Sequence, residues 1–77
     1  MNSVRPHPSR YFVLTARDGG WLIFQEGNRR AINRLPRKNL AVETAKSLAR
    51  ANLPSQVLAE KRDGTLQLLQ SFPRWWQ

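Results

Sequence analysis

Short apolar blocks separated by glycine turns dominate the first part of the chain. Tyr11–Ala16 is rich in aromatic and β-branched residues, and Trp21–Glu26 follows it after Asp18-Gly19-Gly20. Glycine reaches positive φ without a clash of a Cβ atom, so this arrangement predicts a β-hairpin. A short third strand is expected over Arg29–Leu35, after a turn at Gly27-Asn28.

The second apolar block is hydrophobic on both of its faces. In a strand, Trp21 and Ile23 share one face, and Leu22 and Phe24 share the other. We assign Trp21 and Ile23 to the core, because a tryptophan beside a tight turn commonly closes one end of a small core. Leu22 and Phe24 then point outward, where apolar side chains on a sheet face suggest a partner surface.

The middle of the chain changes to a helical period. Apolar positions recur at steps of three and four within Ala41–Leu53, opposite polar positions. This spacing predicts a one-sided helix that begins between Arg37 and Leu40, with Asn39 as a candidate N-cap, and ends before Pro54.

A second hairpin closes the chain, with strands over Ser55–Arg62 and Thr65–Phe72 around Asp63-Gly64. The expected fold is a small single α+β domain of ββ(β)αββ order, with a mostly antiparallel sheet packed against one helix. The domain spans residues 11–73, between a flexible N-terminal arm over 1–10 and an aromatic C-terminal tail over 74–77. The expected core consists of Trp21, Ile23, Ala45, Leu48, Ala49 and Leu66.

Charge narrows the choice of partners. Thirteen Lys and Arg residues face five Asp and Glu residues, which gives a net charge of +8. A positive field of this size attracts polyanions, nucleic acid above all, or an acidic protein surface. The alternative is that the arginines reflect a GC-rich genome and a need for solubility. The densest group lies at the junction of the third strand and the helix: Arg29, Arg30, Arg34, Arg37 and Lys38.

That arginine cluster has the chemistry of a phosphate site. A guanidinium can bind phosphate through two parallel hydrogen bonds, and a nearby helix start adds a positive dipole end. Such contacts give affinity and salt dependence without reading base sequence. A solvated basic loop with scattered ion pairs is the alternative.

Catalytic and metal-binding patterns are missing from the sequence. Cysteine does not occur, and the single histidine, His7, lies between two prolines. The five carboxylates are scattered, and the glycines lack the spacing of a phosphate loop. We therefore expect a protein that is not an enzyme and that uses no catalytic residues, metal or cofactor. Without a run of about 20 apolar residues or a secretory signal, we expect a cytoplasmic protein with no membrane partner.

The order and spacing of several motifs resemble the small bacterial family named domain of unknown function 2188. The resemblance covers residues 11–72 and rests on five short motifs: Asp18-Gly19-Gly20-Trp21, Gly27-Asn28-Arg29-Arg30-Ala31, the alanines Ala41, Ala45 and Ala49, Asp63-Gly64, and Ser71-Phe72. It implies a compact α+β domain without an established activity. This chain differs from the family pattern in its basic helix, in Pro36-Arg37 where members carry a Ser or Thr cap, and in the tail Arg74-Trp75-Trp76-Gln77.

A weaker resemblance links the chain to the arm-type DNA-binding domains of phage integrases. Those domains run strand, strand, strand, helix, with a basic third strand, and their sheet enters the major groove. The resemblance implies DNA contacts by Arg17, Arg29, Arg30 and Arg34, but it is a likeness of fold and does not carry function alone.

Two functions are therefore compatible with the sequence. The first is a nucleic-acid-binding protein or DNA-associated regulator that uses the arginine cluster. The second is a protein-interaction or dimerisation module, of phage or mobile-element origin, that docks on an acidic or host protein. Its contacts would be Leu22, Phe24, Trp75 and Trp76, although the two tryptophans could also stack on bases, fold back onto the core or dock on a second copy. A homodimer would satisfy both functions.

Overall fold

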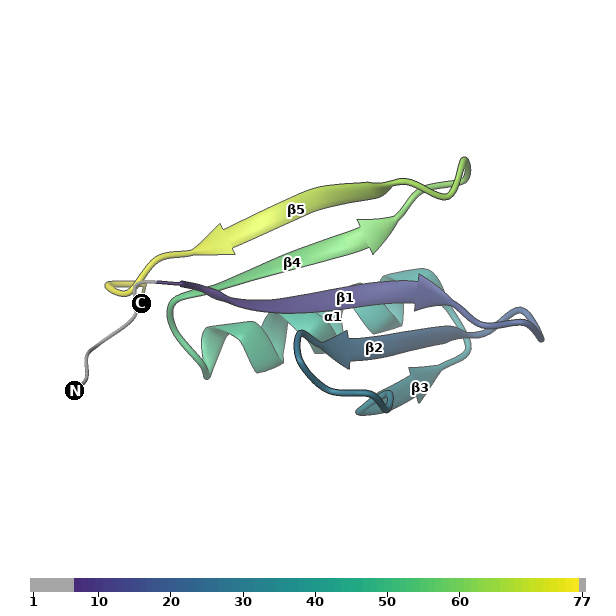
Figure 1. Cartoon of the computed structure of the whole chain (residues 1–77), viewed down its shortest axis with the longest axis horizontal. Helices are drawn as coiled ribbons and strands as arrows, with labels where there is room; N and C mark the ends of the chain where they lie inside the picture. The colour runs from purple at the N-terminus through teal and green to yellow at the C-terminus, as the bar shows by residue number, and fades with distance from the viewer. Residues whose placement is uncertain (1–6, 77) are drawn as a thin grey trace.

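The computed structural model describes residues 7–76, which form five strands and one helix. They are β1 (Ser9–Thr15), β2 (Trp21–Gln25), β3 (Asn33–Leu35), α1 (Lys38–Arg50), β4 (Ser55–Glu60) and β5 (Leu66–Phe72). The strands form one sheet in the order β3-β2-β1-β4-β5, and α1 lies across one face of it (Figure 1). Neighbouring strands are antiparallel except β1 and β4, so the expected α+β class is confirmed.

The parallel pair at the centre of the sheet decides which segments meet. β1 and β4 run side by side in the register Tyr11↔Val57, because the connection between them passes through β2, β3 and α1. Their carboxyl-terminal ends therefore lie at the same end of the sheet. The β1–β2 turn, the β4–β5 turn and the start of α1 gather at that end (Figure 1).

The core lies between the sheet and α1. It contains nine fully buried apolar side chains, which are Tyr11, Val13, Ile23, Ala41, Ala45, Ala49, Val57, Ala59 and Phe72. The helical alanines recur every four residues, and their small side chains allow the helix to approach the sheet closely. Ser55 is also buried, and its hydroxyl donates to the carbonyl oxygen of Ala49 at 2.6 Å, so this buried polar group is satisfied.

Most of the expected core is confirmed, but Leu66 was placed wrongly. Trp21 and Leu48 pack at the margin of the core, whereas Leu66 is half exposed on the opposite face. The cause is a register shift in β5: Val57 is paired with Gln70, but Leu58 is paired with Leu68. One extra residue in β5 reverses the faces of all the residues before it.

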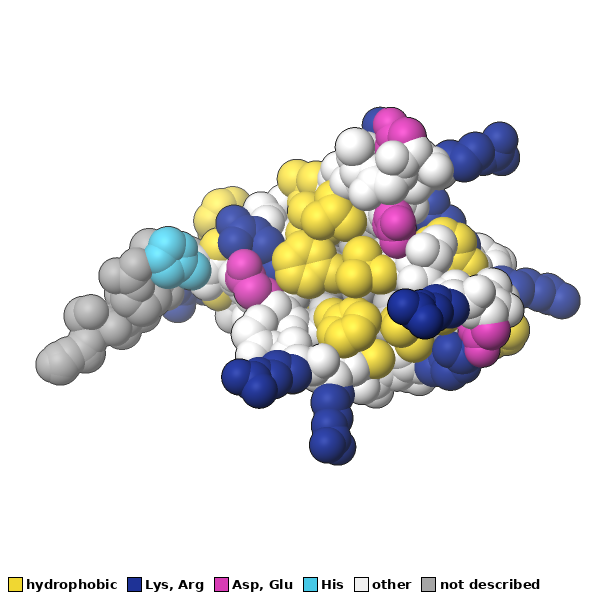
Figure 2. All heavy atoms as spheres, turned by 45° about the vertical axis from the view of Figure 1, so that its right-hand side comes forward, with side chains coloured by type: hydrophobic (Ala, Val, Ile, Leu, Met, Phe, Trp, Pro, Cys, Tyr) yellow, Lys and Arg dark blue, Asp and Glu magenta, His cyan; other side chains and the backbone are white. Residues whose placement is uncertain are grey.

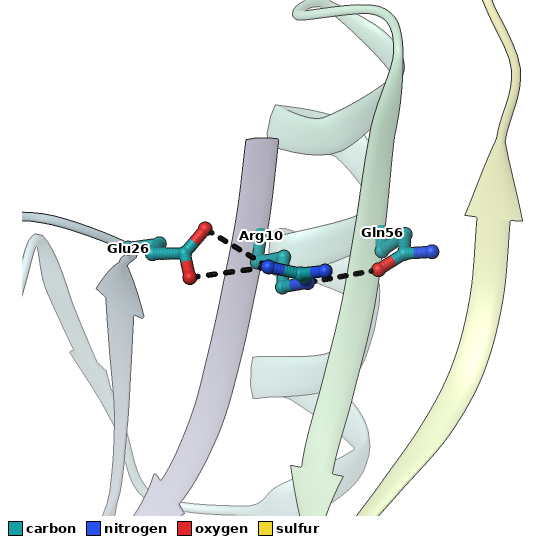
Figure 3. A network of polar contacts seen from close by, with 3 residues as sticks. All are labelled: Arg10, Glu26 and Gln56. Carbon is teal, nitrogen blue, oxygen red and sulfur yellow. Dashed lines mark hydrogen bonds and ion pairs between the residues drawn. The ribbon is translucent and has the colours of Figure 1, made fainter. Parts of the chain in front are cut away.

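The first strand begins two residues earlier than the predicted start at Tyr11. Residues 1–6 of the expected arm lie outside the described residues, but β1 begins at Ser9, whose N–H donates to Pro54 O at 2.9 Å. Arg10 pairs with Glu26 at 3.2 Å and donates to Gln56 at 3.1 Å (Figure 3). Ser9 and Arg10 therefore belong to the sheet.

Two other element boundaries shift. β3 begins at Asn33, and the preceding loop is tied to β2 by a bond from Ile32 N–H to Ile23 O at 2.7 Å. The N-cap of α1 is Arg37, with φ −132° and ψ 148°, so the prediction of Asn39 was wrong. The first helical bond runs from the N–H of Ala41 to the oxygen of Arg37, which places Asn39 inside the first turn. Within the described residues, no helix is long and apolar enough to cross a membrane.

Candidate functional site

Cations from four separate segments meet at the end of the sheet where β1 and β4 finish. We call this region the basic end. In the described chain it consists of Arg17, Arg34, Arg37, Lys38, Lys61 and Arg62, all of them exposed. Three carboxylates accompany them, so cations outnumber carboxylates by two to one. Figure 2, which turns this end forward, shows Lys and Arg side chains projecting from it.

A pocket of about 410 Å³ lies at the basic end. It is lined by Thr15, Trp21, Lys38, Glu60, Lys61 and Arg62. The Nζ atom of Lys38 lies 5.3 Å from the centroid of the Trp21 ring, within the range of a cation–π interaction. The pocket therefore combines three cations with one aromatic wall.

Glu60 is the one carboxylate among the residues that line this pocket. The N–H and hydroxyl of Thr15 both donate to Glu60 Oε1 at 2.9 Å. These two hydrogen bonds, followed by the charge of Lys38, hold the pKa of Glu60 below its ordinary value. Glu60 is therefore ionised at neutral pH, with one oxygen bonded to Thr15.

The other two carboxylates at this end, Asp18 and Asp63, lie in glycine turns and accept hydrogen bonds from residues close to them. Asp18 pairs with Arg34, and the hydrogen bond from Arg34 lowers the pKa of Asp18 most, followed by the bond from the Gly20 N–H. A Cβ atom on Gly20 would lie 3.2 Å from the Arg34 guanidinium, so glycine leaves room for this pair. Thr65 lowers the pKa of Asp63 in the same way, through its hydroxyl and its amide. Arg34 is thus held in an ion pair with Asp18, whereas among the described residues Arg37 has no ion pair of this kind.

The start of α1 contributes to the same end. Arg37 makes no side-chain capping hydrogen bond, and the first turn carries no acidic residue. The first N–H groups of a helix lack partners within the helix, and its N-terminus carries a partial positive charge. An anion at this position would meet both the helix start and the neighbouring cations.

The structure divides the cluster expected from the sequence. Arg17, Arg34, Arg37 and Lys38 lie at the basic end. Arg29 and Arg30 are exposed in the β2–β3 loop, which leaves the other end of β2. Lys61 and Arg62 were missed, because only the parallel pairing of β1 with β4 brings them to the pocket. The one signal in the sequence was their position beside the Asp63-Gly64 turn.

The expected partner-binding residues also fall into two groups. Leu22 and Phe24 are half-buried on the sheet face away from α1. Trp76 packs edge-to-face on Phe72, with ring centroids 5.0 Å apart, while Trp75 is 77% exposed. Of the outcomes considered for the tail, Trp76 therefore folds back onto the core.

The described part of the chain contains no cluster of metal-binding side chains. Between residues 7 and 76, no group of three or more His, Asp and Glu side chains is placed to hold a metal ion. His7 is exposed near the start of β1.

The fold and this site define a small α+β domain with one helix over a five-stranded sheet and basic side chains gathered at one end. Residues 11–72 match the model of the family described as "Uncharacterized protein conserved in bacteria (DUF2188)", and the chain belongs to this family. The resemblance found in the sequence is thereby confirmed. No curated protein and no solved structure gives a significant match to the chain.

Proposed function

We propose that this protein is a small, non-enzymatic nucleic-acid-binding protein, such as a DNA-associated regulator, that holds phosphate groups at its basic end. The observation that supports this function is the gathering of cations from four segments at one end of the sheet, where three of them line one pocket beside an uncapped helix start. We place its action in the bacterial cytoplasm, where chromosomal and messenger nucleic acids are accessible.

The arrangement suits phosphates better than a single carboxylate ligand. Arg17, Arg37 and Arg62 are exposed and belong to three different segments, so together they can follow a chain of phosphates. Trp21 offers an apolar wall on which a sugar or base can rest. Long exposed side chains bind the backbone and not the base edges, so we expect affinity with little sequence preference.

The sheet itself is unsuited to the groove contact that the integrase resemblance implied. The face of β1 and β2 away from α1 carries Phe12, Leu14, Leu22 and Phe24. The cations lie at the ends of these strands and not along them. We therefore assign phosphate binding to the basic end.

The test compares three double variants that each remove two positive charges. Lys61→Gln/Arg62→Gln alters the pocket, Arg29→Gln/Arg30→Gln alters the β2–β3 loop, and Lys46→Gln/Arg74→Gln is the control at distant sites. Fluorescence anisotropy measures binding to labelled duplex and single-stranded DNA and RNA at about 50 and about 200 mM salt. We expect the pocket variant to lose roughly tenfold in affinity and to reduce the salt slope by about 2, with at most a threefold loss in the control.

Three results would contradict the proposal. Equal losses in all three variants would show attraction to net charge alone. A loss confined to the Arg29/Arg30 variant would move the site to the β2–β3 loop. Competition by a polyglutamate peptide at the same charge concentration as DNA would point to an acidic protein as the partner.

A further inference from the structure

One face of the sheet is covered by α1, and the other carries a continuous apolar surface that we call the open face. Its side chains lie on β1, β2, β4 and β5: Phe12, Leu14, Leu22, Phe24, Leu58, Leu66 and Leu68. None of these seven packs against the buried core. Figure 2 shows apolar side chains gathered at the middle of the sheet, with Lys and Arg at its margins.

Two of the three inner strands, β1 and β2, have the apolar composition of strands that are covered on both faces. Tyr11–Leu14 and Trp21–Phe24 are unbroken apolar runs of four residues. A strand with one face in water alternates between apolar and polar residues, whereas a strand buried on both faces is apolar throughout. In the described chain α1 covers only one face (Figure 1). The pattern therefore calls for a second covering layer.

We propose that the open face packs against the open face of a second copy of this chain, forming a homodimer with the two sheets in the middle and the helices outside. Sheets stack about 10 Å apart through interdigitating side chains, and the two outward leucines of β5 extend the apolar surface to one edge. The same surface on both protomers satisfies the self-complementarity of a two-fold interface.

Charge favours a second copy as the occupant. At one end of the open face Arg10 is paired with Glu26, and at the other Arg34 is paired with Asp18. These two ion pairs offset part of the positive charge at both ends of the face. The other cations lie at the basic end, the β2–β3 loop, α1 and the tail, at the margins of the face or beyond it. Two copies can thus bring the apolar side chains at the middle of the face into contact while the unpaired cations stay at its margins.

The area of the face agrees with a dimer of modest affinity. With strands about 4.8 Å apart and residues about 3.3 Å apart, the four strands and their side chains cover on the order of 400 Å² per protomer. Side chains rise above the plane of the sheet, and polar residues border the apolar patch, so the buried surface is larger than the flat area. Together the two protomers bury about 1,000 Å², which is the lower limit for a specific interface. We therefore expect a weak, reversible dimer.

Nucleic-acid bases are a less suitable occupant. Phe12 and Phe24 are directly opposite in the β1–β2 register and could stack two bases. Their neighbours, however, are mostly leucines, and two polar side chains of this face, Arg10 and Gln56, are bonded to each other at 3.1 Å. Few groups are left on this face to hydrogen-bond a base edge.

The test is sedimentation velocity on the full chain across a concentration series. Leu66→Gln/Leu68→Gln removes two side chains of the open face that are 47% and 50% exposed in the monomer. Leu40→Gln is the control, because this side chain is 44% exposed and belongs to α1, which lies on the other face of the sheet. The matched exposure keeps the cost to the monomer small and similar. We expect a wild-type dimer, at least a tenfold weaker dimer in the Leu66/Leu68 variant, and no change in the control.

Several outcomes would overturn the dimer. These are a wild type that stays monomeric at all concentrations, or association that the control variant weakens as much as the Leu66/Leu68 variant does. A monomer whose binding to single-stranded DNA is lost in Phe12→Leu/Phe24→Leu would show instead that bases occupy the face. Circular dichroism of each variant confirms that the monomer fold is intact.

Discussion

Single side chains at the basic end control both the charge of the site and part of the stability. Glu60 connects the end of β4 to β1 through two hydrogen bonds from Thr15. Because these bonds are stronger to the ionised carboxylate than to the protonated acid, the pKa of Glu60 in the folded state lies below the ordinary value of 4.5. A depressed pKa means that the stabilisation is present above the unfolded value and is lost as pH falls through the folded value.

The lowered pKa of Glu60 predicts that the stability of the protein depends on pH. We expect Glu60→Gln to be less stable than wild type at pH 7, and we expect this difference to shrink as pH falls through the lowered pKa of the wild-type carboxylate. Urea unfolding at pH 7 and at an acidic pH measures the change in this difference. Thr15→Val, which keeps the amide donor but removes the hydroxyl, should show a smaller loss at pH 7. A deficit of Glu60→Gln that is the same at both pH values would contradict the prediction.

At the scale of elements, β5 and the tail that follows it complete the core. Phe72, which is paired with the buried Ser55 after the register shift, faces inward, and Trp76 packs over the Phe72 ring. Arg50 of α1 lies 5.9 Å from the centroid of the same ring. Phe72 of β5 therefore contacts both the tail and α1, and Trp75 is left as the more exposed of the two tryptophans.

The two tryptophans of the tail should differ in their effect on stability. Trp76→Ala removes an edge-to-face contact and partly buried apolar area, so we expect the free energy of unfolding to fall by about 1–2 kcal/mol. Trp75→Ala serves as the control and should change it by at most about 0.5 kcal/mol. Urea unfolding at neutral pH measures both. Equal losses, or no loss from Trp76→Ala, would show that the tail does not hold this position in solution.

At the scale of the whole molecule, charge and apolar surface are separated. The basic end and the loops carry the surplus of +8, while the open face is apolar with paired charges at its borders. Nucleic-acid binding and dimerisation would therefore use different surfaces and depend on different forces. A dimer would also carry two basic ends, which raises the effective concentration of the second contact on a long nucleic acid.

Salt should affect nucleic-acid binding and dimerisation in different ways. Raising salt from about 50 to about 500 mM should weaken nucleic-acid binding steeply, because bound counterions are released from the phosphates. The same change should leave the dimer intact or strengthen it, because salt screens the repulsion between two positively charged protomers. Anisotropy and sedimentation velocity on the same samples measure the two effects. A dimer that dissociates as salt rises would indicate an interface made by ion pairs and not by the open face.

Patterns within short stretches of sequence were sufficient to predict the helix and the strands, and to decide which side chains of β2 face the core. The turns predicted at Gly19 and Gly64 have positive φ, the helical alanines are buried, and Ile23 is buried while Leu22 faces outward. Each of these features depends on residues that are close in the sequence: glycine conformation, a period of 3.6 residues or an alternation of two.

Long-range pairing decided the rest. The sequence alone determined the kinds of elements, their order and the excess of positive charge. Only the tertiary structure placed β1 parallel to β4, which brought Lys61 and Arg62 to the start of α1 and left Arg29 and Arg30 apart. One extra residue in β5 likewise moved Leu66 from the expected core to the open face. Strand partners and register depend on contacts between residues far apart in the chain, and no local periodicity encodes them.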